Sequence, residues 1–163
     1  MKKNDVIFRE YDIRGIYDVD FDLKFAFGLG ASFVQHFRAY EPAKHPRFTV
    51  GYDARHSSPA ISNAVTEGIL TAGGDVVRLG LITSPISYFS TFTLPGVEGA
   101  IMVTGSHNPP EYNGFKLSLG RKTIFGDEIQ ALKKYFSEDT PSISPGRATD
   151  FDIFPSYISR YCE

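Results

Sequence analysis

Residues 99–119 have the sequence GAIMVTGSHNPPEYNGFKLSL, and this stretch decides how the chain can fold. The apolar run at residues 100–103 predicts a buried strand, and residues 114–119 alternate apolar and polar side chains as a second strand does. A tight polar loop that contains Ser106 lies between them. The loop therefore holds a serine between two strands that can fix its position, and Lys116 leaves the second strand opposite its apolar residues.

Three roles can explain a serine in this loop. Glycine, serine, asparagine and proline are ordinary turn residues, so the serine can be purely structural. An acyl-transfer serine needs a G-x-S-x-G turn, which is excluded because Gly105 directly precedes Ser106 and Asn108 replaces the second glycine. A phosphoryl-carrying serine needs mainly hydrogen-bond donors and positive charge, which His107, Lys116 and the loop backbone can supply.

The rest of the chain alternates strand and helix patterns. We expect further strands at residues 6–17, 48–52 and 76–82, and helices at about 23–38, 58–72, 84–94 and 127–136. Ser58 and Ser84 are each followed by proline, so we expect both serines to be helix N-caps. This alternation predicts an α/β domain with helices on both faces of a short sheet whose central strands are parallel. The two strands of residues 99–119 can add an antiparallel edge.

The first helix carries three specific expectations. Asp22 is expected to cap its N-terminus. Gly28 and Gly30 are weak helix formers, and we expect them to allow close packing on the sheet. His36 falls on the polar side of the helix, so we expect its ring to be exposed.

The composition excludes several classes of protein. The 163 residues are 42% hydrophobic, which suits one folded domain and not a disordered chain. No apolar run is long enough to cross a bilayer, the N-terminus lacks a signal peptide, and a net charge of −2 disfavours nucleic acid as a partner. The lone cysteine, Cys162, cannot form an internal disulfide, and the four histidines lack zinc-ligand spacing. We therefore expect a cytoplasmic protein with no membrane or nucleic-acid partner.

The C-terminal segment changes character. Residues 1–137 form the expected domain, and residues 138–150, rich in Ser, Thr, Pro and Asp without periodicity, predict a linker. Residues 151–163 then show helical spacing in a short stub that has nothing of its own to pack against.

Three motifs resemble those of the α-D-phosphohexomutases, the family of phosphoglucomutase and phosphomannomutase. TGSHNPPEYNGFK is similar to the family's phosphoserine loop, FREYDIRG at residues 8–15 to its N-terminal signature, and GYDARHSS at residues 51–58 to its second signature. The resemblance covers nearly the whole chain. It implies the family's domain I, a three-layer α/β/α domain with a short, mixed, mostly parallel four-stranded sheet. The stub at residues 151–163 matches the helix that leads into the family's second domain.

The resemblance also implies roles for five residues. Ser106 would carry the phosphate that moves between C1 and C6 of a glucose or mannose phosphate through a bisphosphorylated intermediate. Lys116 would be the general acid and base, and Arg14 would bind the phosphate of the serine. His107 would contact the substrate or assist proton transfer, and Tyr11 would form part of the site wall. Without the resemblance, Arg14, Lys116 and His107 would be taken as an ordinary surface charge, strand-edge charge and loop histidine.

Asp53 and Arg55 lie in the second motif. They can pair with each other or brace the serine loop from outside the chemistry, and we favour the brace.

The same resemblance implies Mg²⁺ held by an Asp-rich D-G-D-G-D-R loop together with the phosphate on the serine. That loop is not in this sequence, so Ser106, through its phosphate, is the one metal ligand that we expect here. We therefore expect the first of four domains, either a fragment or a natural truncation, inactive without domains II to IV. The alternative is a free-standing domain that binds phosphosugars or proteins without catalysis. An Asp-rich loop encoded after Glu163 in the native gene would favour the enzyme.

Overall fold

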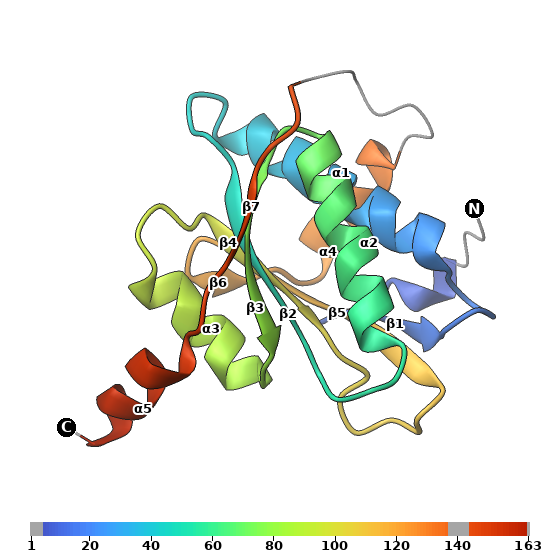
Figure 1. Ribbon diagram of the computed structural model, residues 1–163. Helices are drawn as coiled ribbons and strands as arrows, with labels where there is room; N and C mark the ends of the chain where they lie inside the picture. The colour runs from blue at the N-terminus through green and yellow to red at the C-terminus, as the bar shows by residue number, and fades with distance from the viewer. Residues whose placement is uncertain (1–4, 137–143, 163) are drawn as a thin grey trace.

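The computed structural model describes residues 5–136 and 144–162, which form three layers with a sheet between two sets of helices (Figure 1). The strands in these residues are β1 (Ile13–Ile16), β2 (Arg47–Tyr52), β3 (Asp75–Leu81), β4 (Gly99–Val103), β5 (Tyr112–Leu119), β6 (Lys122–Thr123) and β7 (Ala148–Asp150). The α-helices are α1 (Leu23–Tyr40), α2 (Ser58–Thr71), α3 (Ser84–Thr93), α4 (Asp127–Leu132) and α5 (Phe154–Cys162), with 3₁₀ turns η1 (Asp5–Ile7) and η2 (Lys133–Tyr135). Helices α1, α2 and α4 cover one face of the sheet and α3 covers the other, as the sequence predicted (Figure 1).

The sheet has more strands than predicted. In the described part of the chain, seven strands follow the order β1-β5-β4-β2-β3-β7, with β6 paired to β5. The pairs β2–β3, β2–β4 and β3–β7 are parallel, whereas β5 pairs antiparallel with β1, β4 and β6. The sheet is mixed, as expected, but four strands were too few, and parallel pairs do not predominate. The unforeseen strands β6 and β7 have two and three residues, too short for an apolar pattern to reveal.

The two faces of the sheet have separate apolar clusters. Ile13, Val103 and Phe115 are buried in the larger cluster under α1 and α2. Met102 lies in the smaller cluster on the other face, together with Ile86 of α3. Because side chains alternate along a strand, the residues next to Ile13 and Phe115 are directed to the face that carries α3. This alternation decides where the candidate site can lie.

Part of the predicted linker is structured. Residues 137–143 lie outside the described residues, but Ala148–Asp150 is strand β7, which pairs in parallel with β3. The linker prediction is therefore wrong for these three residues, which join the sheet through backbone hydrogen bonds that need no apolar pattern.

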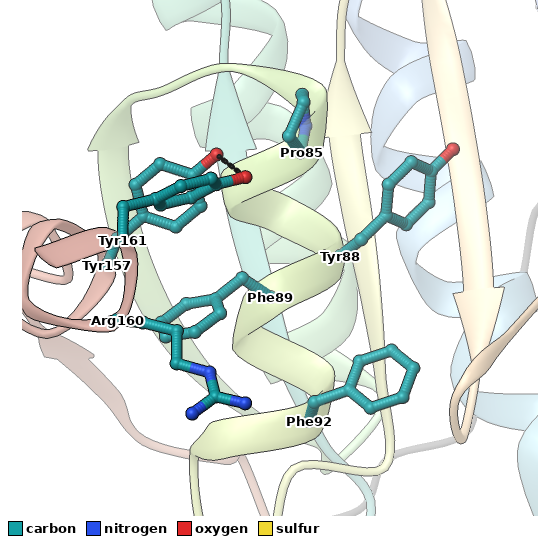
Figure 2. Close-up of a pocket in the computed structure, with 7 residues that line it drawn as sticks. All are labelled: Pro85, Tyr88, Phe89, Phe92, Tyr157, Arg160 and Tyr161. Carbon is teal, nitrogen blue, oxygen red and sulfur yellow. Dashed lines mark hydrogen bonds between the residues drawn. The ribbon is translucent and has the colours of Figure 1, made fainter. Parts of the chain in front are cut away.

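The expected stub also packs against the domain. Ile153 is fully buried in the smaller cluster. The ring of Tyr157 on α5 meets that of Phe89 on α3 edge to face, with centroids 5.2 Å apart (Figure 2). The prediction that this segment has nothing to pack against is wrong, because α3 presents aromatic side chains to it (Figure 2).

Helix N-termini are partly as predicted. The Asp22 side chain accepts a hydrogen bond of 2.8 Å from the Phe25 amide and caps α1, as expected. The predicted caps Ser58 and Ser84 are instead the first residues of α2 and α3. The Ser58 hydroxyl donates to Asp53 at 2.6 Å, so tertiary structure uses the group that the local pattern assigned to a cap.

Glycines bring α1 and α2 together. A Cβ atom on Gly30 would collide with the Val65 carbonyl oxygen of α2, and one on Gly68 would collide with the Phe27 carbonyl oxygen of α1. The two helices therefore approach as closely as their backbones allow. Gly30 serves helix–helix packing and not, as predicted, packing on the sheet.

His36 is fully buried, not exposed as predicted. Its ring lies edge to face with Tyr40 on the same helix and Tyr135 of η2, with centroids 5.0 and 5.8 Å away. Neither ring nitrogen has a hydrogen-bond partner among the described residues. The helical pattern could not show that η2, about a hundred residues later in the chain, covers this side of α1.

Candidate active site at the end of strand β4

Ser106 lies in the loop that joins β4 to β5, and its backbone is unusual. Its φ angle is +55°, in the left-handed region that non-glycine residues seldom adopt. The side chain is exposed, and its hydroxyl oxygen lies 3.4 Å from Nδ1 of His107. The loop therefore presents the serine oxygen to solvent in a conformation that the surrounding structure must maintain.

Arg14 and Lys116 project from the same face of the neighbouring strands. Arg14 pairs with Gly114 across β1 and β5, and Lys116 is two residues further along β5. On the other side of β5, the Thr104 amide donates to the Gly114 carbonyl oxygen at 2.9 Å, so Thr104 extends the row formed by Gly114 and Arg14. Strand spacing puts the Arg14 and Thr104 backbones about 10 Å apart. The loop that carries Ser106 begins immediately after Thr104.

Asp12 joins the two cations. Its side chain is buried, with 7% of the residue exposed, and it accepts a hydrogen bond and forms an ion pair with Arg14. Lys116 Nζ lies 3.8 Å from Asp12 Oδ2. Sequence reasoning missed this carboxylate, although its spacing from Arg14 puts both on one face of a strand.

Asp53, at the end of β2, holds the start of the serine loop. Its carboxylate accepts hydrogen bonds from the Thr104 hydroxyl at 2.8 Å, the Gly105 amide at 3.2 Å and the Ser58 hydroxyl at 2.6 Å. Burial acts to raise the pKa of Asp53, but these bonds and that from the Arg55 amide outweigh it and lower the pKa below its usual value. Asp53 is therefore an ionised acceptor that is already fully engaged.

Arg55 crosses the same loop from outside. Its guanidinium donates to four carbonyl oxygens, those of Ser106, Asn108 and Pro109 in the loop and that of Tyr112, the first residue of β5. Its Nε donates to Asp53 at 3.2 Å. Both alternatives for Asp53 and Arg55 thus hold at once, since they pair with each other and brace the loop.

The structure divides the predicted site residues into two groups. Arg14 and Lys116 meet at Asp12, whereas Ser106 and His107 lie together on the loop. Among the described residues, no hydrogen bond or ion pair joins the two groups. Tyr11 is 69% exposed beside the ring of Phe125, and no contact in this structure ties it to the serine.

A shallow hollow of about 430 Å³ opens beside the serine. It is lined by Asp53, Ala54, Arg55, His56, Ser106, Asn108 and Pro110. The predicted cations Arg14 and Lys116 are not part of this lining.

Comparison with known proteins identifies the family. The model of the phosphoglucomutase/phosphomannomutase alpha/beta/alpha domain I matches residues 5–142. The chain belongs to the phosphoglucomutase/phosphomannomutase family, and it corresponds to domain I.

Relatives of this family align over nearly the whole chain. A phosphomannomutase of Vibrio cholerae is 42% identical over 156 residues, which cover 93% of this chain and 33% of the relative. A phosphomannomutase/phosphoglucomutase of Pseudomonas aeruginosa is 32% identical over 154 residues, covering 94% of this chain and 32% of the relative. A crystal structure of a phosphoglucomutase/phosphomannomutase family protein from Burkholderia thailandensis superimposes with a TM-score of 0.87 at 35% identity, covering 97% of this chain and 35% of that one. The chain thus spans about a third of the length of the relatives that it matches.

The described part of this domain I contains no ready-made metal site. No three His, Cys, Asp or Glu side chains in residues 5–136 and 144–162 are grouped so that they could hold an ion. Asp53, the carboxylate bonded to the start of the serine loop, already accepts from hydroxyl and amide groups. None of the helices in these same residues is both long and apolar enough to cross a membrane.

Proposed function

We propose that this chain is the phosphoserine-bearing first domain of a hexose-phosphate mutase. In the whole protein, Ser106 would carry a phosphoryl group and exchange it with a glucose or mannose phosphate, so that phosphate moves between C1 and C6. The observation that carries this proposal is that Arg14, Gly114 and Thr104 lie in one row across three neighbouring strands. This row puts the strands that carry Arg14 and Lys116 beside the point where the serine loop begins.

Charge is the main requirement of such a site. A phosphate on Ser106 adds about −1.5 to −2 charges at pH 7, and phosphoryl transfer depends on positioning and on electrostatic stabilisation of that charge. Arg14 presents a planar guanidinium suited to two phosphate oxygens. Gly114 has no side chain, so no side chain stands at the β5 position between Arg14 and Thr104. Arg14 is therefore the residue that we assign to the serine phosphate.

Lys116 is the residue that we assign to proton transfer. In one half-reaction, a sugar hydroxyl oxygen attacks the phosphorus and gives its proton to Lys116, the bond from phosphorus to Ser106 Oγ breaks, and the leaving Oγ takes a proton from the adjoining His107 ring. In the other half-reaction, His107 takes that proton back as Ser106 Oγ attacks the second phosphate of the bisphosphorylated sugar, the bond from that phosphorus to the sugar oxygen breaks, and Lys116 returns its proton to the released sugar oxygen. Lys116 lies on the same strand face as Arg14, the residue assigned to the serine phosphate.

His107 and Tyr11 are assigned to the substrate side of the same site. The His107 ring adjoins the serine oxygen, where it can donate to the incoming phosphate or sugar hydroxyl. The exposed ring of Tyr11 can contribute to the wall against which the sugar binds. Mg²⁺, when bound to the phosphate on Ser106, would neutralise part of its charge, with its remaining ligands coming from outside this chain.

The serine assignment has a direct test in the full-length protein encoded by the native gene. The wild-type protein and Ser106→Ala are incubated with glucose 1,6-bisphosphate, and intact mass is measured. We expect one added phosphate on wild type and none on Ser106→Ala. Ser144→Ala, a change at an exposed serine outside the loop, is the matched control and should retain the phosphate. Phosphate on Ser106→Ala, or none on wild type, would contradict the proposal.

The isolated domain has its own expectation. We expect the 163-residue chain alone not to interconvert glucose 1-phosphate and glucose 6-phosphate. It would offer Mg²⁺ the phosphate oxygens on Ser106 without the further ligands, and Tyr11 would form part of the wall around the sugar without the rest. A coupled assay with glucose 6-phosphate dehydrogenase measures this. Measurable turnover by the isolated chain would refute the expectation without affecting the role of Ser106.

A further inference from the structure

We infer that Arg55, oriented by Asp53, is the positioning residue that holds Ser106 in its left-handed conformation and thereby fixes the direction of its hydroxyl oxygen. This inference rests on the proposed function only for the role of Ser106 as the carrier of the phosphoryl group. The geometry that supports it concerns this chain alone.

Arg55 uses every hydrogen-bond donor of its guanidinium group. Nη1 donates to the carbonyl oxygens of Pro109 at 2.6 Å and Tyr112 at 3.0 Å. Nη2 donates to the carbonyl oxygens of Ser106 at 3.1 Å and Asn108 at 2.6 Å. Nε takes the fifth bond, to Asp53. A guanidinium has five N–H groups in a fixed plane, so this site matches its full capacity.

The Ser106 backbone is held on both sides of its α-carbon. Its amide donates to the Thr104 hydroxyl oxygen at 2.9 Å, and that hydroxyl donates to Asp53 at 2.8 Å. Its carbonyl oxygen accepts from Arg55. Since Asp53 and Arg55 are themselves bonded, the two restraints on the serine close into one network.

The network explains how an unfavourable backbone can persist. A left-handed φ at serine is disfavoured by its Cβ and survives where neighbouring contacts over-determine it. We call the bonds from Asp53 and Arg55 to this loop the clamp. Gly105 leaves room for it, since a side chain there would collide with the guanidinium carbon of Arg55. The loop is thus tied to β2 at several backbone points and not through the serine side chain, which stays free to accept and release a phosphate.

Rigid presentation of the oxygen has a kinetic consequence. A reacting group misplaced by about 1 Å can lose about 100-fold in rate, although substrate still binds. Loss of the clamp should therefore lower the phosphorylation rate of Ser106 and kcat and leave KM nearly unchanged. A residue that merely stabilised the fold would lower the amount of active protein instead.

Arg55→Lys is the informative variant, because lysine keeps the charge but has three donors without the planar fork. Arg38→Lys is the matched control, since Arg38 also donates to two carbonyl oxygens, of Ala72 at 2.7 Å and Gly73 at 3.1 Å, at a distance from the loop. In the 163-residue chain, hydrogen exchange of the loop amides is measured. We expect faster exchange in residues 104–113 of Arg55→Lys alone, and protection equal to wild type would overturn the clamp.

In the full-length protein, the rate of Ser106 phosphorylation by glucose 1,6-bisphosphate is measured by rapid quench and intact mass. We expect Arg55→Lys to be slower by about 100-fold, with Arg38→Lys equal to wild type. An equal rate in Arg55→Lys would overturn the inference. If wild type takes up no phosphate, the proposed function fails and the exchange experiment decides the clamp by itself.

A second variant keeps the test decisive if Arg55→Lys folds poorly. Arg55→Ala is assayed with and without free guanidinium at concentrations far below those that denature proteins. Recovery of loop protection on adding guanidinium supports the clamp. No recovery in a variant whose circular dichroism matches wild type overturns it.

Discussion

Asp12, the residue before β1, faces Lys116 of β5, with Oδ2 and Nζ 3.8 Å apart, and the same carboxylate is bonded to Arg14. One buried anion is therefore shared by the two cations that the proposed function assigns to the serine phosphate and to proton transfer. Its charge offsets theirs while Ser106 carries no phosphate. A phosphate on the serine would give both cations a second anion, so Asp12 sets the electrostatic balance of the site.

Asp12→Asn tests that balance through stability. The change leaves Arg14 and Lys116 next to each other without their shared carboxylate, so we expect the free energy of unfolding to fall by about 1.5–3 kcal/mol. Urea unfolding followed by circular dichroism measures it. Asp150→Asn is the control, because it removes a carboxylate from the exposed ion pair with Arg78 and should have a much smaller effect. Equal losses in the two variants would mean that Asp12 is no more than a surface partner.

Lys116→Gln tests proton transfer in the full-length protein. Removal of a general acid and base lowers turnover by about 10²–10⁴-fold, so we expect kcat for glucose 1-phosphate to fall by that range with a smaller change in KM. Lys122→Gln, at an exposed position of β6, should retain full activity. A Lys116→Gln enzyme that differed from wild type in KM alone would show that the lysine binds substrate and does not move protons.

Gly68→Ala tests the contact between α1 and α2. Helix propensity alone would favour alanine by about 1 kcal/mol. The new Cβ would instead meet the Phe27 carbonyl oxygen, and we expect overpacking to destabilise the domain by about 1–3 kcal/mol. Asn63→Ala, an exposed change to alanine in the same helix, should be neutral or slightly stabilising. A Gly68→Ala protein with a raised melting temperature would show that the helices can separate without penalty.

Most of the layer structure was predictable because long elements carry their own periodicity. The apolar spacing of α1 and the capping aspartate Asp22 are local, and so is the apolar run of β4. Strand β7 has no comparable signal, since its place depends on backbone pairing with β3. The same limit applied to Ser58, whose hydroxyl is used by Asp53.

The roles of Ser106, Arg14 and Lys116 stay predictions, drawn from the loop pattern and from the resemblance. The structure adds that the two cations share a strand face. Asp12 was missed because its partner Lys116 lies about a hundred residues away, and the pairing of β1 with β5 cannot be inferred from either strand alone. Long-range register, and not residue type, was the missing information.

His36 shows the same limit on the helical side, and its burial has a consequence for stability. The ring is enclosed between Tyr40 and Tyr135, and burial lowers the pKa of His36 below its usual value, with Glu128 opposing the shift only in part. In the unfolded chain the ring titrates at about pH 6.5. Below that pH the unfolded state binds a proton that the folded state does not, so unfolding is favoured as pH falls.

We therefore expect the contribution of His36 to be fully present above about pH 6.5 and to be lost as pH falls toward its lower folded pKa, at up to about 1.4 kcal/mol per pH unit. His36→Leu, close in volume and without ring nitrogens, should flatten the dependence of the unfolding free energy on pH between 5 and 7, as measured in urea. It should also be at least as stable as wild type at pH 5, because it removes two buried nitrogens that lack partners among the described residues. His56→Leu, at an exposed ring, should follow the wild-type pH dependence. An unchanged slope in His36→Leu would place the acid sensitivity elsewhere in the domain and would mean that the folded protein can protonate this ring.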